Sequence, residues 1–166
     1  KLLCLKEYLN KNSSNDWLIF CHDKKSPHLG NRGTPWRKRL LKGIFSLETV
    51  NAALDNSDKF SMWGTAREGV TYSIKIMSTL VNIEYIKRIM HMFNINHLPP
   101  RMAFVEGTMF WVKEETYRDL FKKINIDDII NMLEYNNVYE PSYTHAVERL
   151  LGLMITINDK KIGNIK

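Results

Sequence analysis

A dense group of basic and histidine side chains follows a short apolar run early in the sequence. The stretch FCHDKKSPHLGNRGTPWRKRL, residues 20–40, contains only one carboxylate, Asp23. Its basic and imidazole groups are His22, Lys24, Lys25, His28, Arg32, Arg37, Lys38 and Arg39. Lysine and arginine neutralise a diphosphate, histidine donates to phosphate oxygens or acts as acid or base, and the hydroxyl of Ser26 adds a hydrogen bond. The pattern fits the binding of a phosphorylated small molecule, and a solvated basic loop is the plain alternative.

Two later stretches carry residues that can shape a ligand site. Gly107 lies between extended runs at residues 102–105 and 109–112, and glycine lets a backbone approach a ligand closely. We expect Met109, Phe110 and Trp111 to be core residues rather than a stacking surface for a ligand. In the last helix one face carries His145, Glu148, Arg149 and Gly152 at helical spacing. Glycine inside a helix costs about 1 kcal/mol relative to alanine, which indicates a face that something approaches.

Strands and helices alternate along the chain, and these elements must position the groups above. Strands are expected at residues 17–21, 60–64, 102–105 and 109–112. Helices are expected at residues 2–10, 36–42, 83–93, 114–124, 126–133 and 141–157, with one more beginning after Ser46. Ser46 and Asn82 are expected N-caps, and Pro141 suits a first helical turn. This alternation predicts an α/β fold in a single domain over residues 1–166.

Composition narrows the classes of protein that remain. The chain has 166 residues, 44% hydrophobic residues and a net charge of +6, which describes a folded protein with an anionic partner. No apolar run reaches the roughly 18 residues of a membrane span, and the first residues do not resemble a signal peptide. Two isolated cysteines, Cys4 and Cys21, indicate a reducing compartment and neither a disulfide framework nor a zinc site.

Four segments in order resemble one family. HDKKSPH followed by WRKRLL, then FVEGTMFWVKEE, then THAVERLLG are similar to the rhamnan synthesis F family of bacterial polysaccharide glycosyltransferases. That family has a histidine, any residue, lysine, a basic residue and serine, and then Trp-Arg. A Gly-(Ser/Thr)-Met-Phe-Trp block and a His-Ala-(hydrophobic)-Glu-Arg block follow. Each block alone is weak, but their order across most of the chain is specific.

The resemblance implies a glycosyltransferase A-type fold, a nucleotide-sugar-binding α/β sandwich. This chain would be its later, C-terminal portion and would lack the N-terminal nucleoside-binding part. The implied donor is a nucleotide diphosphate deoxyhexose such as dTDP-rhamnose. The implied acceptor is a hydroxyl of a cell-surface polysaccharide or lipid-linked glycan, and by analogy the transfer inverts the sugar configuration. We expect a cytoplasmic location, with peripheral association with the inner face of the membrane left open.

The same resemblance assigns roles to individual residues. The donor phosphates would be bound by His22, Lys24, Ser26 and Arg37. The sugar and acceptor pocket would be formed by Gly107, Thr108, Trp111, His145 and Arg149. Glu140 is the first candidate for the catalytic base and Glu148 the second, although Glu140-Pro141-Ser142 stands where the family usually has Asp-Gly-Thr. Other enzymes of this fold place an Asp-x-Asp metal motif where His22-Asp23-Lys24 stands. A lysine therefore replaces the divalent cation in this interpretation, and Asp23 is the ligand if a cation is used.

Two alternative functions stay open at this point. A basic nucleic-acid-binding module would use Trp36, Arg37, Lys38 and Arg39, and it would explain the basic run but not the other blocks. A catalytically inactive homologue would act as a scaffold within a larger synthase. The glycosyltransferase interpretation expects a nucleotide sugar and a glycan as partners and no nucleic acid.

Overall fold

The structure, a computed structural model, describes residues 2–12, 14, 16–21, 30–31, 33–64, 71–73, 82–99, 101–105, 109–133 and 142–164. Helices in these ranges are α1 (Leu2–Lys11), α2 (Gly33–Ile44), α3 (Leu47–Asp55), α5 (Ile83–Met92), α6 (Glu114–Lys123), α7 (Ile126–Met132) and α8 (Tyr143–Ile157). Strands are β1 (Trp17–Phe20), β2 (Phe60–Gly64), β3 (Thr71–Ser73), β4 (Arg101–Ala103), β5 (Phe110–Lys113) and β6 (Lys161–Asn164).

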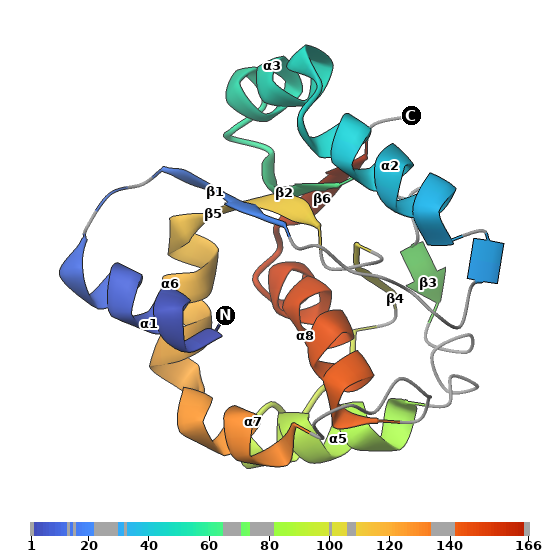
Figure 1. Cartoon of the computed structure of the whole chain (residues 1–166). Coiled ribbons are helices and arrows are strands. Elements are labelled where there is room, and N and C mark those ends of the chain that lie inside the picture. Colours follow the sequence, from blue (N-terminus) through green and yellow to red (C-terminus); the bar gives the residue numbers. More distant parts are fainter. Residues whose placement is uncertain are drawn as a thin grey trace.

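The main sheet has four strands in the order β1-β5-β2-β6 (Figure 1). β5 runs antiparallel to both β1 and β2, whereas β6 pairs in parallel with β2. β3 and β4 form a separate antiparallel pair. The sheet is therefore mixed, and the α/β class predicted from the sequence is confirmed.

Helices cover both faces of the main sheet. In Figure 1, α2 and α3 lie above the sheet, and α6 and α8 lie below it. Side chains alternate between the faces along each strand. Phe110 and Val112 of β5 join the larger core, built with α5, α6 and α8, whereas Trp63 and Trp111 face the smaller clusters under α2 and α3. The molecule is a three-layer sandwich with its larger core below the sheet.

Local sequence signals account for several of these helices. In α5, Ile83, Ile86 and Ile89 are all buried, as their helical spacing predicts. Ser46 is the N-cap of α3, because its Oγ accepts a hydrogen bond of 3.1 Å from the backbone N–H of Thr49. Both predictions are confirmed.

Other elements differ from their predicted bounds. α2 begins at Gly33, ahead of the expected Trp36, because proline at position 35 lies in the first turn, where its missing N–H needs no partner. β4 ends at Ala103, and Phe104 and Val105 leave the strand. β3 and β6 were not predicted. β6 has the sequence KIGN, with a single apolar side chain, and it becomes a strand by pairing with β2.

Candidate active site

Three strand ends meet at one edge of the main sheet. Phe20 at the end of β1 and Gly64 at the end of β2 are both in register with Phe110 at the start of β5. Because β5 is antiparallel to both neighbours, the chain leaves β1 and β2 where it enters β5. The predicted phosphate-binding residues His22, Lys24 and Ser26, and the predicted pocket residues Gly107 and Thr108, lie outside the described residues. The strands next to these two segments are described: β1 ends, and β5 begins, at residues that are paired with each other.

Helix α2, which carries the WRKRLL block, is attached to the strand of the GTMFW block. Met109 is fully buried against Leu40 and Ile44 of α2. The indole N–H of Trp111 donates a hydrogen bond of 2.6 Å to the backbone oxygen of Ile44. Met109 and Phe110 are core residues, as predicted, and Trp111 is half-buried between β5 and α2. Arg37 is half-buried on α2.

Only part of the basic block of α2 faces solvent. Lys38 and Arg39 are exposed, whereas Trp36 packs against the cluster of Leu40, Ile44 and Met109. A nucleic-acid surface that stacks bases on Trp36 needs the indole face to be accessible. The packing of Trp36 therefore favours a structural role for this side chain.

The N-terminus of α8 is held by hydrogen bonds that also fix a histidine. Ser142 is the N-cap, and its Oγ accepts from the backbone N–H of His145 at 3.3 Å. The same Oγ lies 2.7 Å from Nδ1 of His145. The backbone N–H of Ser142 donates to Oδ1 of Asn82 at 2.8 Å, and both residues are fully buried. His145 is half-buried and is therefore oriented by a cap that is itself anchored to the start of α5.

A second contact joins α8 to β4 and the residues after it. The Arg149 guanidinium carbon lies 5.2 Å from the centroid of the Phe104 ring, within the range of a cation–π contact. Nη1 of Arg149 donates to the backbone oxygen of His145 at 3.0 Å. A Cβ at Gly152 would meet the backbone oxygen of Ala103 and would lie 2.6 Å from Cα of Phe104. The sequence predicted that something approaches Gly152, and the approaching group is the chain's own β4 segment.

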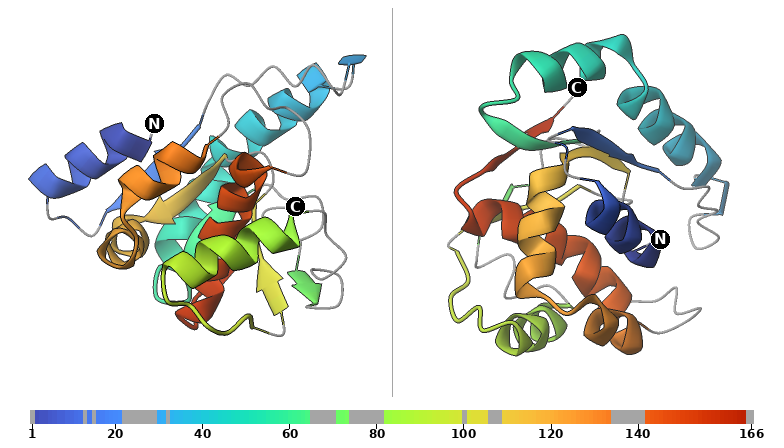
Figure 2. Two further views of the ribbon diagram at one scale, coloured as in Figure 1. Left: turned by 90° about the horizontal axis from the view of Figure 1, so that it is seen from below. Right: turned by 90° about the vertical axis from the view of Figure 1, so that its left-hand side faces the viewer.

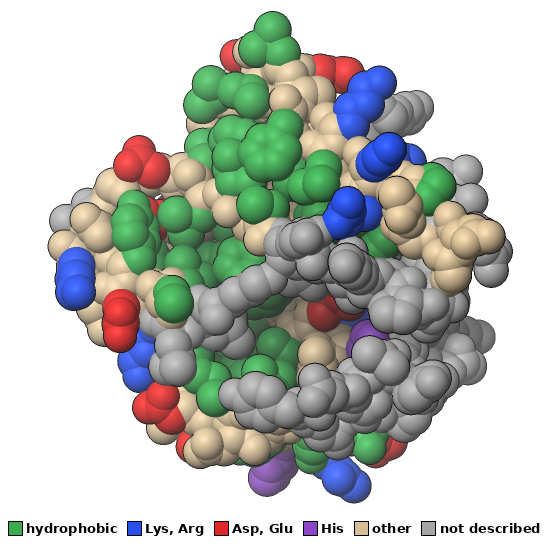
Figure 3. Space-filling model, viewed as in Figure 1, with side chains coloured by type: hydrophobic (Ala, Val, Ile, Leu, Met, Phe, Trp, Pro, Cys, Tyr) green, Lys and Arg blue, Asp and Glu red, His purple; other side chains and the backbone are tan. Residues whose placement is uncertain are grey.

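The described residues of the predicted pocket do not all lie together. His145 and Arg149 lie in the N-terminal half of α8, next to Glu148, whereas Trp111 faces α2 on the other side of the main sheet. His145 and Glu148 are half-buried and three residues apart, so they share a face, and Arg149 follows. On the face viewed in Figure 3, acidic and histidine atoms are visible near the centre of the molecule, where α8 lies. Glu140, the first candidate base, lies outside the described residues, whereas Glu148 lies within them.

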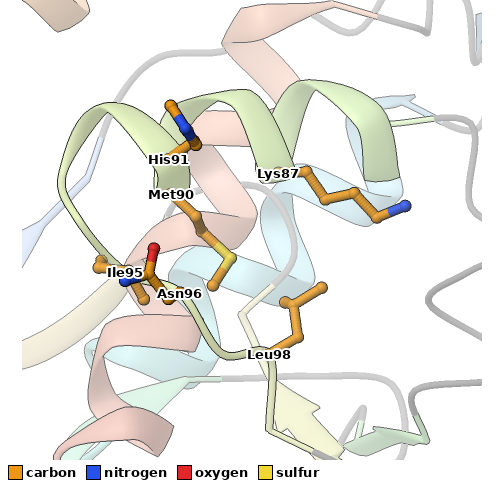
Figure 4. A pocket seen from close by; sticks show the side chains of 6 residues that line it. All are labelled: Lys87, Met90, His91, Ile95, Asn96 and Leu98. Carbon is orange, nitrogen blue, oxygen red and sulfur yellow. The ribbon is translucent and has the colours of Figure 1, made fainter.

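A pocket of about 320 Å³ lies at the end of α5, and it contains none of the predicted site residues. It is lined by Lys87, Met90, His91, Ile95, Asn96 and Leu98. Figure 4 shows Met90 and Leu98 pointing toward the same space, while the amine of Lys87 extends away from it. That amine lies 2.7 Å from Glu84. The pocket is thus mainly apolar, and its nearest cation already has an anionic partner.

Metal ligands and membrane spans were searched for in the described ranges. Within them, no three His, Cys, Asp or Glu side chains are grouped to hold a metal ion. Asp23, the predicted ligand if a cation is used, lies outside those ranges. No helix in the described part of the chain is long and apolar enough to cross a membrane.

Sequence reasoning missed three residues at the candidate site: Phe104, Asn82 and Ser142, which is the N-cap of a helix that was expected to begin at residue 141. Phe104, which packs under Arg149, was expected to continue a strand. Asn82 was expected to cap its own helix, yet its side chain makes no cap hydrogen bond there and instead reaches Ser142. No periodic signal links positions 82 and 142, because a contact across the fold has no local sequence pattern.

Comparison with known proteins identifies one family. A family model described as Rhamnan synthesis protein F matches residues 1–160 of this chain. No curated protein and no solved structure matches the chain significantly. The match spans all the blocks described above, from the strand before His22 to the end of α8.

Proposed function

Because the chain belongs to the rhamnan synthesis protein F family, which implies a role in rhamnose polysaccharide synthesis, we propose that it is a glycosyltransferase. It transfers a rhamnose-like deoxyhexose from a nucleotide diphosphate donor, such as dTDP-rhamnose, to a hydroxyl of a cell-surface polysaccharide or lipid-linked glycan. In this proposal its mixed sheet, covered by helices on both faces, belongs to a glycosyltransferase A-type sandwich.

One observation carries this proposal: the register of Phe20 and Gly64 with Phe110 at a single sheet edge. The segment with His22 and Lys24 follows the first of these strand ends, and the segment with Gly107 precedes the third. The crevice at strand ends is a common location of ligand sites in α/β proteins. The segment with His22 and Lys24 therefore begins, and the segment with Gly107 ends, next to residues that are paired in the sheet, although the two segments are far apart in the sequence.

On the donor side, the protein promotes the reaction by stabilising the charge of the leaving group. As the bond between the sugar and the diphosphate breaks, negative charge develops on the leaving oxygen, and nearby cations stabilise it. Lys24 and Arg37 supply this charge in our proposal, while His22 and Ser26 donate hydrogen bonds to phosphate oxygens. Lys24 then takes the place of a divalent cation, and Asp23 is the ligand if a cation is bound.

The acceptor side requires a base. The hydroxyl oxygen of the acceptor attacks the anomeric carbon while a carboxylate removes its proton, and the configuration of the sugar inverts. Glu140 and Glu148 are the two candidates. Glu148 lies on the same helix face as His145. Because the Glu148 side chain is half-buried, an acceptor hydroxyl could reach its carboxylate while bulk water is partly excluded. Gly107 and Thr108 shape the sugar pocket, with Trp111 packing behind them against α2, and Arg149 steadies this part of α8 through Phe104.

The bonding of Ser142 suggests what His145 does in this site. Oγ of Ser142 lies 2.7 Å from Nδ1 of His145, and in our proposal the hydroxyl donates its proton to this nitrogen. A histidine that accepts at Nδ1 is neutral and carries its proton on Nε2. His145 therefore acts as a hydrogen-bond donor to a sugar oxygen, and a glutamate remains the base.

Nucleotide titration tests the proposal most directly. Isothermal calorimetry with dTDP-rhamnose, dTDP and inorganic pyrophosphate should give saturable binding of all three. Pyrophosphate should compete with the two nucleotides if the basic segment holds the leaving group. Folded protein that binds none of these ligands would contradict the donor site, and donor binding without transfer to rhamnose-polymer acceptors would favour the scaffold alternative.

A further inference from the structure

The corner between α2 and α3 exposes large apolar side chains next to a basic helix face. Phe45 is 57% exposed and Leu47 is 74% exposed, and Leu54, two turns further along α3, is 57% exposed. The other exposed large apolar side chains in the described ranges, Tyr8, Ile19 and Met92, are less exposed and are spread over other elements. A cluster of exposed apolar residues of this kind marks an interaction surface.

The basic face of α2 leads directly to this corner. Lys38, Lys42 and Phe45 follow one another at helical spacing, and both lysines are exposed, as is Arg39. α2 contains no acidic residue. Glu48 and Asp55 belong to α3, so the positive charge is concentrated on α2. Figure 3 shows lysine and arginine side chains along α2 and hydrophobic side chains over α3, on the same face of the molecule.

Hydrogen bonds hold the backbone of the corner in place. Oγ of Ser46 donates to the backbone oxygen of Gly43 at 3.0 Å, and it also caps α3. The carbonyl of Ile44 accepts from the indole of Trp111 in the main sheet. Phe45 and Leu47 are therefore presented outward from a rigid support and are not parts of a loop that could fold back onto the core.

We propose that this corner docks the protein on a membrane surface that contains anionic lipids. Apolar side chains enter the boundary between headgroups and acyl chains, and lysines beside them bind anionic headgroups, which is the pattern of interfacial membrane anchors. A second copy of the chain is a poorer occupant, because two-fold pairing at this corner would bring the basic faces of two α2 helices together. The proposal does not depend on the transferase activity, since vesicle binding requires no donor.

Vesicle co-sedimentation tests this docking. We expect the full chain to bind vesicles of phosphatidylcholine with phosphatidylglycerol, to bind pure phosphatidylcholine much more weakly, and to lose binding as salt is raised. The double variant Phe45→Ser/Leu47→Ser should bind at least about tenfold more weakly. Met92→Ser, which changes an exposed apolar residue on α5, should bind like the wild type. Circular dichroism should show that the variants stay folded, since the changed side chains are exposed.

Charge variants separate the two parts of the surface. Lys38→Glu/Lys42→Glu should weaken binding to anionic vesicles about tenfold or more, whereas Lys122→Glu, on the 75%-exposed lysine of α6, should change it little. No binding of the wild type to anionic vesicles would overturn the proposal. So would equal binding by the serine double variant, or self-association of the wild type in sedimentation velocity that this variant abolishes. Binding to RNA that competes with the vesicles and depends on the same lysines would assign the face to a nucleic acid instead.

Discussion

Oδ1 of Asn82 accepts a hydrogen bond of 2.8 Å from the backbone N–H of Ser142, and this bond joins the starts of α5 and α8 inside the protein. Neither residue is accessible to solvent. An N–H at a helix start has no partner within its helix, so a side chain from elsewhere must satisfy it when water is excluded. The bond fixes the cap of α8, and the cap orients His145.

Replacing Asn82 with alanine should therefore destabilise the protein by about 1–3 kcal/mol, because the buried N–H of Ser142 loses its acceptor. Urea unfolding measures this difference. Asn51→Ala, an exposed position on α3, is the matched control and should change the unfolding free energy by less than about 0.5 kcal/mol. Equal stability of the two variants would show that the bond contributes nothing.

Gly152 permits the close approach of α8 and the β4 segment. Gly152→Ala should destabilise the protein by about 2 kcal/mol or more, because the new methyl group meets backbone atoms of Ala103 and Phe104 that cannot rotate away. Thr144→Ala, at an exposed position of the same helix, should be close to neutral. Thermal unfolding of both variants provides the comparison, and a Gly152→Ala protein as stable as wild type would show that the two segments can separate at little cost.

Local patterns in the sequence explain which parts of this fold were predictable. The isoleucines of α5 and the cap at Ser46 depend on neighbours within a few residues, so spacing alone indicates them. β6 depends on its pairing with β2, and the Asn82–Ser142 bond depends on how two helices pack. Gly152 was predictable only in part. Its cost to the helix indicated a close contact, but only the fold identifies Phe104 as the neighbour.

Lys24 is the cation that we assign to the donor diphosphate. Lys24→Ala should weaken the binding of dTDP-rhamnose and pyrophosphate about tenfold or more, because a charge-assisted hydrogen bond is lost. Lys122→Ala, at an exposed position of α6, removes the same charge elsewhere and should leave binding unchanged. Calorimetry gives both affinities. Identical donor affinity in the two variants would remove Lys24 from the site.

The two candidate bases can be separated by amide substitutions. Glu148→Gln or Glu140→Gln, whichever removes the base, should lower the transfer rate by about 10²–10⁴-fold while donor binding persists. The other substitution should have a much smaller effect. Glu84→Gln, on the exposed face of α5, controls for loss of a carboxylate. Rates at a saturating donor concentration provide the measurement, and wild-type rates in both variants would mean that neither glutamate is the base.

Histidine at position 145 should contribute by donating a hydrogen bond, if Ser142 holds it in the neutral form with its proton on Nε2. His145→Gln retains a donor on a side chain of similar reach, so it should keep more activity than His145→Ala. Ser142→Ala should lower the transfer rate and also stability by about 1 kcal/mol, the usual contribution of an N-cap. The pH profile distinguishes the two roles, because a base at His145 would introduce a dependence near its ordinary pKa that the alanine variant abolishes.

Glu114 should make stability depend on pH in the region where α1 lies beside α6 (Figure 2). There Arg118 of α6 donates hydrogen bonds to the backbone oxygen of Leu9 in α1 and to the carboxylate of Glu114. Burial alone would raise the pKa of Glu114, but hydrogen bonding by Arg118, with Ser14 and Tyr8 beside it, holds the pKa below its usual 4.5. A carboxylate with a lowered pKa contributes stability above its unfolded-state pKa. That contribution is lost as the pH falls through the folded-state value.

The unfolding free energy of the wild type should therefore fall more steeply than that of Glu114→Gln, which has no carboxylate to protonate, once the pH falls below about 4.5. Glu115→Gln, changed at the next residue on a half-exposed side chain, should follow the wild type. Urea unfolding at each pH gives the three curves. Parallel curves for wild type and Glu114→Gln would mean that the ion pair with Arg118, at 2.8 Å, does not stabilise the charged form of Glu114.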